Sequence, residues 1–311
     1  MQRSRTSNSC GTLLSEITGT RKKLSIASFT SPMGGQQPSL SAIEIMTTTV
    51  LADWTVAMDR QLAADEPATV ATLAQIVLRK LPRHLATYQR LLAVAWRLQR
   101  WEEGEDWGRR LLRADPTNAL AWRALAMAAE QRGERAQAHA IWQRAFEAAP
   151  YEPEIRAGLS RTTLHPANAP STPVGELPTL VLNLACLATF YRRGLQWERA
   201  AVTYRQLLQA DARRIDFQIG LMATLWQQRS RQAAYQLAQH LTSHHPQLVL
   251  AWVALQAIGD ENDKALAHAP LAAMDPDGEF VSLWFGLHYE VPPATLNVSA
   301  AEAALLHTYV N

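Results

Sequence analysis

The chain has 311 residues, 48% of them hydrophobic, and its 30 basic and 28 acidic side chains leave a formal net charge of +2. So small an imbalance excludes the sequence-wide basic footprint of most nucleic-acid binders, and two cysteines exclude a disulfide framework, which favours a reducing compartment. No segment approaches the ~18 apolar residues that span a bilayer, so we expect a cytoplasmic protein without membrane insertion or a nucleic-acid partner.

The first 45 residues differ in composition from the rest of the chain. They contain five basic and two acidic residues and none of the ten tryptophans. The residues after the basic run at 21–23 are too polar for the apolar core of a secretory signal. Two interpretations remain, a disordered tail or an upstream extension that precedes a true start at Met46.

Residues 85–118 and 119–152 repeat one 34-residue unit. In each copy an aromatic residue precedes a leucine by three positions, a small residue lies near the middle, and a proline ends the unit. These residues are Tyr88, Leu91, Gly104 and Pro116 in the first copy, and Trp122, Leu125, Ala138 and Pro150 in the second. The apolar spacing predicts helix, turn and helix, and the proline ends the second helix. One helical pair cannot bury both of its faces, so neighbouring pairs are expected to stack.

The unit at 119–152 resembles a tetratricopeptide repeat. The residues that match the order of that family's pattern are Trp122, Leu125, Ala126, Ala129, Ala138, Trp142, Ala145 and Pro150. The copy at 85–118 departs from the pattern at Gly108, where an aromatic is usual, and Trp101 and Trp107 are candidates to fill the lost volume. The resemblance implies an all-α fold, a right-handed superhelical solenoid of antiparallel helix pairs.

The same phase divides residues 46–164 into a first block of units. Its repeats are expected at 51–84, 85–118 and 119–152, followed by a capping helix at 153–164. Four prolines between residues 165 and 178 exclude a regular helix there. This stretch is interpreted as a linker between two blocks or as a loop inserted in one continuous superhelix, and a merely variable connection is the third possibility.

The period resumes in a second block at 179–276. Its repeats are expected at 181–214 and 215–248, with a degenerate unit at 249–276 whose turn is compressed. Residues 277–311 are predicted to cap the exposed end, since terminal units of repeat arrays usually differ from internal ones. The resemblance therefore spans residues 51 to about 276.

No catalytic residue, metal site or cofactor is predicted, because the sequence lacks a phosphate-binding loop, a nucleophile elbow, a zinc-protease helix and a paired CxxC. His240, His244 and His245 could share a metal only with further ligands, and we expect them to interact with a helix C-terminus instead. Cys186 lacks a basic neighbour one turn away and is expected in the core. The tryptophans that share one phase are expected between packed helices: Trp54, Trp122 and Trp252.

The family resemblance places the first helix of each unit on a concave face. The residues at that phase are Gln89, Trp96, Arg97, Arg123, Met127, Gln131, Arg161, Arg192, Arg193 and Trp226. Arginine beside exposed aromatic surface is typical of binding hot spots, and guanidinium groups suit carboxylates. We therefore expect this groove to bind a protein or peptide, with an acidic or C-terminal peptide as the natural ligand. The alternative is that these residues form a solvated face.

These observations predict a non-catalytic scaffold or adaptor for protein–protein interaction. An accessory or regulatory subunit of an enzyme complex is the alternative. An RNA-binding helical repeat is disfavoured, because such arrays read bases with polar residues at fixed positions, and those positions vary freely here.

Overall fold

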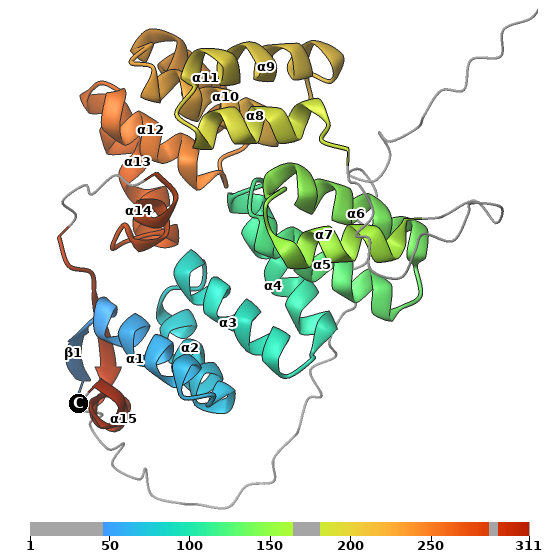
Figure 1. Cartoon of the computed structure of the whole chain (residues 1–311). Helices are drawn as coiled ribbons and strands as arrows, with labels where there is room; N and C mark the ends of the chain where they lie inside the picture. The colour runs from blue at the N-terminus through green and yellow to red at the C-terminus, as the bar shows by residue number, and fades with distance from the viewer. Residues whose placement is uncertain (1–45, 164–180, 286–291, 311) are drawn as a thin grey trace, which may run out of the picture. The chain divides into compact units, whose positions relative to one another are not determined.

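The computed structural model describes residues 46–163, 181–285 and 292–310 (Figure 1). The predicted tail at 1–45 and the proline-rich stretch at 165–178 lie outside the described residues. The described part contains fifteen helices and two short strands, and consecutive helices pack against each other from α1 to α7 and from α8 to α13. The predicted all-α fold of stacked helix pairs is confirmed.

The helices before the first gap are α1 (Leu51–Ala63), α2 (Pro67–Lys80), α3 (Leu85–Arg97), α4 (Trp101–Ala114), α5 (Ala119–Gln131), α6 (Arg135–Ala148) and α7 (Pro153–Thr162). Those after it are α8 (Leu184–Arg193), α9 (Trp197–Ala210), α10 (Ile215–Gln227), α11 (Arg231–His244), α12 (Val249–Ile258), α13 (Glu261–Met274), α14 (Glu279–Phe285) and α15 (Ala300–Val310). The strands are β1 (Met46–Val50) and β2 (Thr295–Ser299).

Prolines mark the boundaries of these helices. Pro67 and Pro153 begin α2 and α7, where the fixed φ suits the first turn and the missing N–H has no helical acceptor to lose. Five further prolines lie two residues beyond the end of a second helix, which they could not continue. They are Pro82, Pro116, Pro150, Pro246 and Pro276.

A side-chain donor six residues later bonds the carbonyl oxygen at this terminal position of the repeat. The pairs are Tyr88 Oη to Pro82, Trp122 Nε1 to Pro116 at 2.9 Å, Gln218 Nε2 to Ala212 at 2.7 Å and Trp252 Nε1 to Pro246 at 2.8 Å. A backbone carbonyl between two helices needs such a partner. The recurring aromatic is therefore a hydrogen-bond donor as well as a core residue.

The three tryptophans predicted between packed helices are buried to different extents. Trp54 is fully buried and donates to the Thr49 hydroxyl at 2.9 Å. Trp122 and Trp252 pack against the core but stay partly exposed. Trp54 and Trp142 are the two largest fully buried side chains in the described part of the chain.

Two glycines make room for an aromatic ring of the preceding helix. A Cβ at Gly158 would overlap the ring of Trp142, and one at Gly220 would lie 2.5 Å from the ring of Tyr204. In both pairs the glycine follows the aromatic by 16 residues. At both places a large aromatic ring on one helix packs against a glycine on the next helix. The register between one unit and the next therefore depends on these contacts.

Gly108 is compensated in a different way from the one predicted. A Cβ there would lie 2.6 Å from Leu125 Cδ1 and 3.0 Å from the Ala121 carbonyl oxygen, so α5 fills the space. Trp101 instead packs edge-on against Trp96, and Trp107 packs against Tyr88. Without a side chain at Gly108 the neighbouring helix approaches closely, and no substitute aromatic is needed.

The C-terminal segment returns to the first repeat. β2 pairs with β1 as an antiparallel ladder from Met46 opposite Ser299 to Val50 opposite Thr295, and α15 contacts α1 (Figure 1). Four buried side chains of this segment join the core around Trp54: Leu296, Val298, Ala303 and Leu306. Residues 292–310 thus cover the first unit, whereas α14 packs against α12 of the last unit, the end that the expectation had 277–311 cap. No helix pair precedes the first unit among the described residues, and β2 and α15 cover its apolar face instead.

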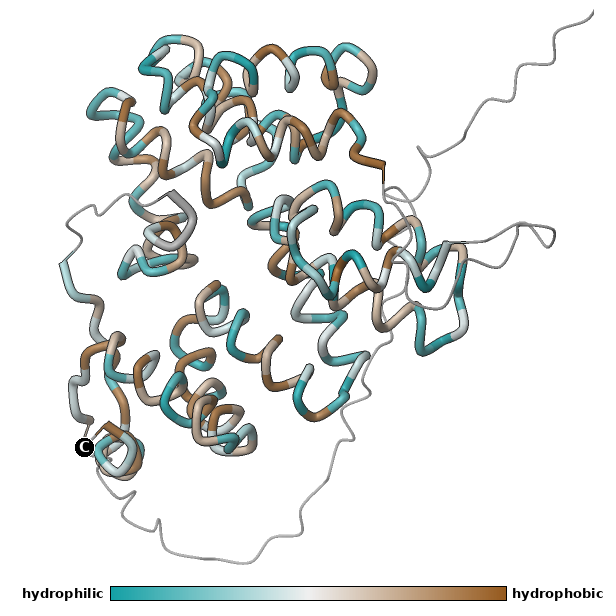
Figure 2. The backbone as a smooth tube through the Cα atoms, in the orientation of Figure 1, coloured by the Kyte–Doolittle hydropathy of each residue, from teal (hydrophilic) through white to brown (hydrophobic). Residues whose placement is uncertain are grey.

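Helices of the two predicted blocks share one hydrophobic cluster. It joins residues of α3, α4 and α5 to residues of α10 to α14, among them Leu92, Leu111, Met222, Leu255 and Phe280. Along most helices hydrophobic positions recur between hydrophilic ones (Figure 2). Except for Trp252, the residues from Val249 to Leu255 in α12 are all buried. A helix that is apolar all round requires neighbours on every side, and the shared cluster supplies them.

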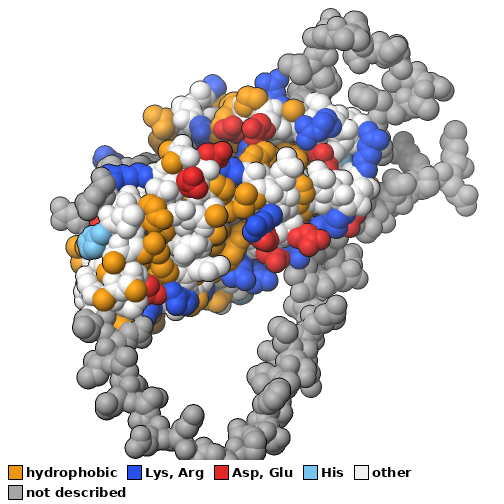
Figure 3. Space-filling model, turned by 90° about the horizontal axis from the view of Figure 1, so that it is seen from below, with side chains coloured by type: hydrophobic (Ala, Val, Ile, Leu, Met, Phe, Trp, Pro, Cys, Tyr) orange, Lys and Arg blue, Asp and Glu red, His pale blue; other side chains and the backbone are white. Residues whose placement is uncertain are grey.

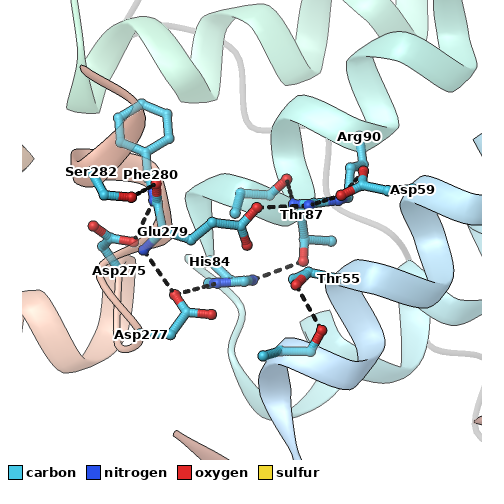
Figure 4. A network of polar contacts seen from close by, with 12 residues as sticks. Thr55, Asp59, His84, Thr87, Arg90, Asp275, Asp277, Glu279, Phe280 and Ser282 are labelled. Atoms are coloured by element: carbon cyan, nitrogen blue, oxygen red, sulfur yellow. Dashed lines mark hydrogen bonds and ion pairs between the residues drawn. The ribbon is translucent and has the colours of Figure 1, made fainter. Parts of the chain in front are cut away.

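A polar network centred on α3 connects it to α1 and to the start of α14 (Figure 4). Arg90 is 7% exposed and bonds both carboxylate oxygens of Asp59 at 2.8 and 2.5 Å and one of Glu279 at 2.7 Å. His84 is fully buried, and its Nε2 lies 3.8 Å from Asp277 Oδ1. That distance suits an ion pair and is too long for a hydrogen bond.

Replacing Arg90 with glutamine is expected to lower the free energy of unfolding by about 1.5 to 3 kcal/mol, the range for hydrogen bonds to charged groups. The substitution removes the bonds to Asp59 and Glu279, and Asp59 is exposed enough to regain water. Urea unfolding of the two proteins measures the difference. Arg113→Gln on the exposed side of α4 is the control. A loss for Arg90→Gln below about 0.5 kcal/mol, as at an ordinary surface site, contradicts the assignment.

Candidate partner-binding surface

Three first helices bring together part of the predicted groove. The guanidinium carbon of Arg123 in α5 lies 4.1 Å from the ring centroid of Trp96 in α3, and the same guanidinium forms an ion pair with Glu154 in α7. The Arg123 side chain is 21% exposed, and that of Glu154 is 60% exposed. Arg123 Nε is buried and has no hydrogen-bond partner among the described residues. Stacking on the indole and the ion pair hold the guanidinium in one orientation.

A second cluster lies further along α5 and α7. Arg161 Nη2 is 3.4 Å from the Glu130 carboxylate and 3.9 Å from Met127 Sδ. Its guanidinium carbon lies 5.9 Å from the ring centroid of Trp142, whose Nε1 donates to Glu130. Met127 and Arg161, which were predicted separately, are therefore neighbours.

Arg97 binds the preceding unit. It donates to the Leu62 carbonyl oxygen at the end of α1 and lies 3.1 Å from the Asp65 carboxylate. Asp65 has a φ of 58°, in the left-handed region, where aspartate is tolerated better than most residues. Arg97 thus stabilises the turn between α1 and α2 through these two contacts.

The predicted residues of the second block belong to other surroundings. Arg193 stacks on Tyr151, with 4.2 Å from the guanidinium carbon to the ring centroid. Burial is the main cause that raises the pKa of the Tyr151 hydroxyl. Arg192 lines a cavity between α6 and α10, and Trp226 packs against two core clusters.

The two predicted glutamines take no part in these contacts. Gln89 is partly buried and Gln131 is exposed, and neither side chain forms a hydrogen bond within the described ranges. The structure therefore assembles Trp96 with Arg123 and Met127 with Arg161. It does not join all ten predicted residues into one site.

Acidic residues that the sequence reasoning overlooked neutralise the arginines of this surface. Ion pairs connect consecutive first helices at a separation of 31 residues. The pairs are Asp59 with Arg90, Arg123 with Glu154, and Glu130 with Arg161. Equivalent positions on neighbouring first helices are 34 residues apart. A separation of 31 residues therefore joins two positions that differ by about one helical turn along the helices. A search for opposite charges at this spacing would have found the pairs.

A partly buried ionic junction was also missed. Arg214 Nη2 lies 2.7 Å from both Glu147 and Asp216, and Arg144 lies 3.8 and 3.7 Å from the same two carboxylates. Arg144, Glu147, Asp216 and Arg192 border a cavity of about 40 Å³ between α6 and α10. That space suits water and is far below the ~300 Å³ of small-molecule sites. The junction therefore joins helices of the two blocks.

The remaining reactive side chains have structural surroundings. Cys186 is buried 3.7 Å from the Phe146 carbonyl oxygen, and burial raises the pKa of its thiol to about 11, which disfavours the nucleophilic thiolate. The rings of His240 and His244 are exposed and 4.3 Å apart at the end of α11. Burial lowers the pKa of His245, and the neighbouring histidines add to this effect.

Among the described residues no group of three or more histidine, cysteine or acidic side chains is arranged to hold a metal ion. No helix in the same ranges combines the length and the apolar character needed to cross a membrane. Comparison with protein-family models and with curated protein sequences finds no match to this chain.

Proposed function

We propose that the chain is a non-catalytic, cytoplasmic scaffold of the tetratricopeptide type, which binds a partner protein or peptide along α3, α5 and α7. The pairing of Trp96 with Arg123 is the observation that carries this proposal. A guanidinium already stacked on an indole loses little conformational freedom when it binds a carboxylate, and arginine and tryptophan are common hot-spot residues.

The proposed ligand group is an acidic side chain or C-terminal carboxylate of the partner, which replaces Glu154 on Arg123. Glu154 is 60% exposed, and an exposed ion pair contributes only about 0 to 1 kcal/mol. Its displacement therefore costs little.

The test uses the tagged full chain to capture a partner from native lysate, followed by calorimetry with the purified partner. Arg123→Ala is expected to weaken binding at least about tenfold, which corresponds to 1.4 kcal/mol. Glu154→Gln is expected to strengthen binding, because the competing carboxylate is gone. Arg113→Ala, at an exposed position outside this surface, is the control.

Two outcomes would contradict the proposal. If Arg123→Ala and Arg113→Ala bind the partner with the same affinity, the partner does not bind along α3, α5 and α7. If Glu154→Gln weakens binding, the ion pair itself belongs to the binding surface and the displacement mechanism is wrong.

A further inference from the structure

A second surface lies on the opposite set of helices. A groove of about 930 Å³ runs between α2 and α4, the second helices of the first two units, with α3 beneath it. Its apolar lining includes Ile76, Leu91, Val94 and Trp107. Figure 3 views the molecule from below Figure 1, the side on which α1, α2 and α15 lie, and hydrophobic side chains reach the surface there between charged ones.

The charged side chains of the groove are mainly basic. Arg79, Arg100 and Arg110 line it, and Glu103 is the only acidic residue among the lining residues. Arg79 forms an exposed ion pair with Glu302, and Arg100 lies 3.5 Å from Glu103. The pair of Arg100 with Glu103 is exposed on both sides and weak for that reason, and in the other pair Arg79 is exposed while Glu302 is partly buried.

Arg110 is the most available of the three cations. It is exposed and forms no ion pair with a carboxylate in the described ranges. Its guanidinium carbon lies 4.6 Å from the ring centroid of Trp107 and 5.8 Å from that of Tyr88. Stacking on these rings holds a positive charge beside the apolar lining, where an incoming carboxylate can bind it.

The dimensions suit a helix. α2 and α4 have 14 residues each, which corresponds to about 21 Å at 1.5 Å per residue. A partner helix of three to four turns would match the flanking helices in length. Helix-in-groove binding places apolar residues at i, i+3, i+4 and i+7 on the floor and leaves polar residues at the edges.

We propose that the α2/α4 groove binds an amphipathic helix of a partner protein, with an apolar face and acidic residues along its edges. This rests on the proposed function of partner binding and places a contact on the second helices. The excess of arginine selects an acidic occupant. Residues 1–45 of the chain carry five basic and two acidic residues, so their charge has the same sign as that of the groove.

The experiment selects peptides from a displayed random library of 14-residue sequences against the full chain. Enriched peptides are expected to be acidic, with apolar residues at helical spacing. Fluorescence anisotropy then gives their affinities. Arg110→Glu is expected to weaken binding at least about tenfold, and higher salt is expected to weaken it as well. Arg113→Glu is the matched control, since Arg113 lies on the same helix, is exposed and does not line the groove.

Three results would overturn the proposal. Selected peptides could be basic or lack helical spacing, or Arg113→Glu could weaken binding as much as Arg110→Glu. Arg110→Glu could also change the sedimentation of the protein without peptide, which would identify a second copy as the occupant. Trp96 and Arg123 are intact in both variants. A partner captured through them therefore still binds if only this inference fails.

Discussion

Replacing Trp142 with alanine is expected to lower the free energy of unfolding by about 3 to 5 kcal/mol, the range for large buried aromatics. Trp142 is 1% exposed, packs directly on the backbone of α7 at Gly158, and donates to Glu130. The substitution leaves a cavity between α6 and α7 and removes the donor of a partly buried carboxylate. Urea unfolding of the two proteins measures the loss.

A double-mutant cycle with Gly158→Ala separates the packing of the ring from general damage. In the wild type the added methyl group overlaps the indole, so Gly158→Ala is expected to cost about 1 to 3 kcal/mol. In the Trp142→Ala background the same methyl group enters the cavity and should cost less or restore stability. Equal costs in both backgrounds would show that the two residues do not pack together.

Replacing Asp115 with asparagine is expected to stabilise the protein above about pH 7 by up to about 3 kcal/mol. Asp115 is fully buried at the end of α4, and burial raises the pKa of its carboxyl from 3.8 to about 6, against opposing bonds from Thr117. Oδ1 accepts from the Thr117 hydroxyl at 2.7 Å, whereas Oδ2 has no partner among the described residues. A shift of about two pKa units corresponds to ~3 kcal/mol.

The sign follows from proton binding. Between pH 3.8 and about 6 the folded protein keeps a proton on Asp115 that the unfolded chain has released. The contribution of this group to the free energy of unfolding is therefore greatest below this window and falls as the pH rises through it. Asparagine resembles the protonated acid and removes that dependence.

Unfolding of wild type and Asp115→Asn at a series of pH values measures the effect, because their difference cancels the other titrating groups. The two proteins should be equally stable near pH 3.8 and diverge toward pH 7. Asp106→Asn on the exposed side of α4 is the control. If Asp115→Asn is less stable than the wild type at high pH, the buried carboxylate is charged and favourably paired.

Part of the candidate surface follows from the repeat phase. The phase places Trp96 and Arg123 on consecutive first helices, and the structure stacks one on the other. Glu154 and Glu130 were not predicted, because the groove prediction rested on arginine and aromatic residues and not on the acidic residues that pair with them. Gln218 was overlooked for a similar reason, since its amide replaces an aromatic N–H or O–H at the Ala212 carbonyl oxygen.

Several residues predicted to line the groove make contacts within the chain instead. Arg97 and Arg161 are engaged by Asp65 and Glu130, so their charge is partly used within the chain. Trp226 lies against the core, which the groove prediction did not foresee. Helical periodicity reports which face a residue occupies, and the packing of neighbouring units decides whether that face meets solvent.

The sequence by itself determined the helix pairs and their boundaries, because helical spacing, turn composition and proline act within a few residues of where they occur. Tertiary structure alone decided that β2 pairs with β1, that Arg90 binds Glu279, 189 residues away, and that helices of both blocks share a core. Such contacts depend on which apolar and polar faces remain uncovered after the units stack. A period of 34 residues carries no information about contacts between distant parts of the array, and only the folded chain brings those faces together.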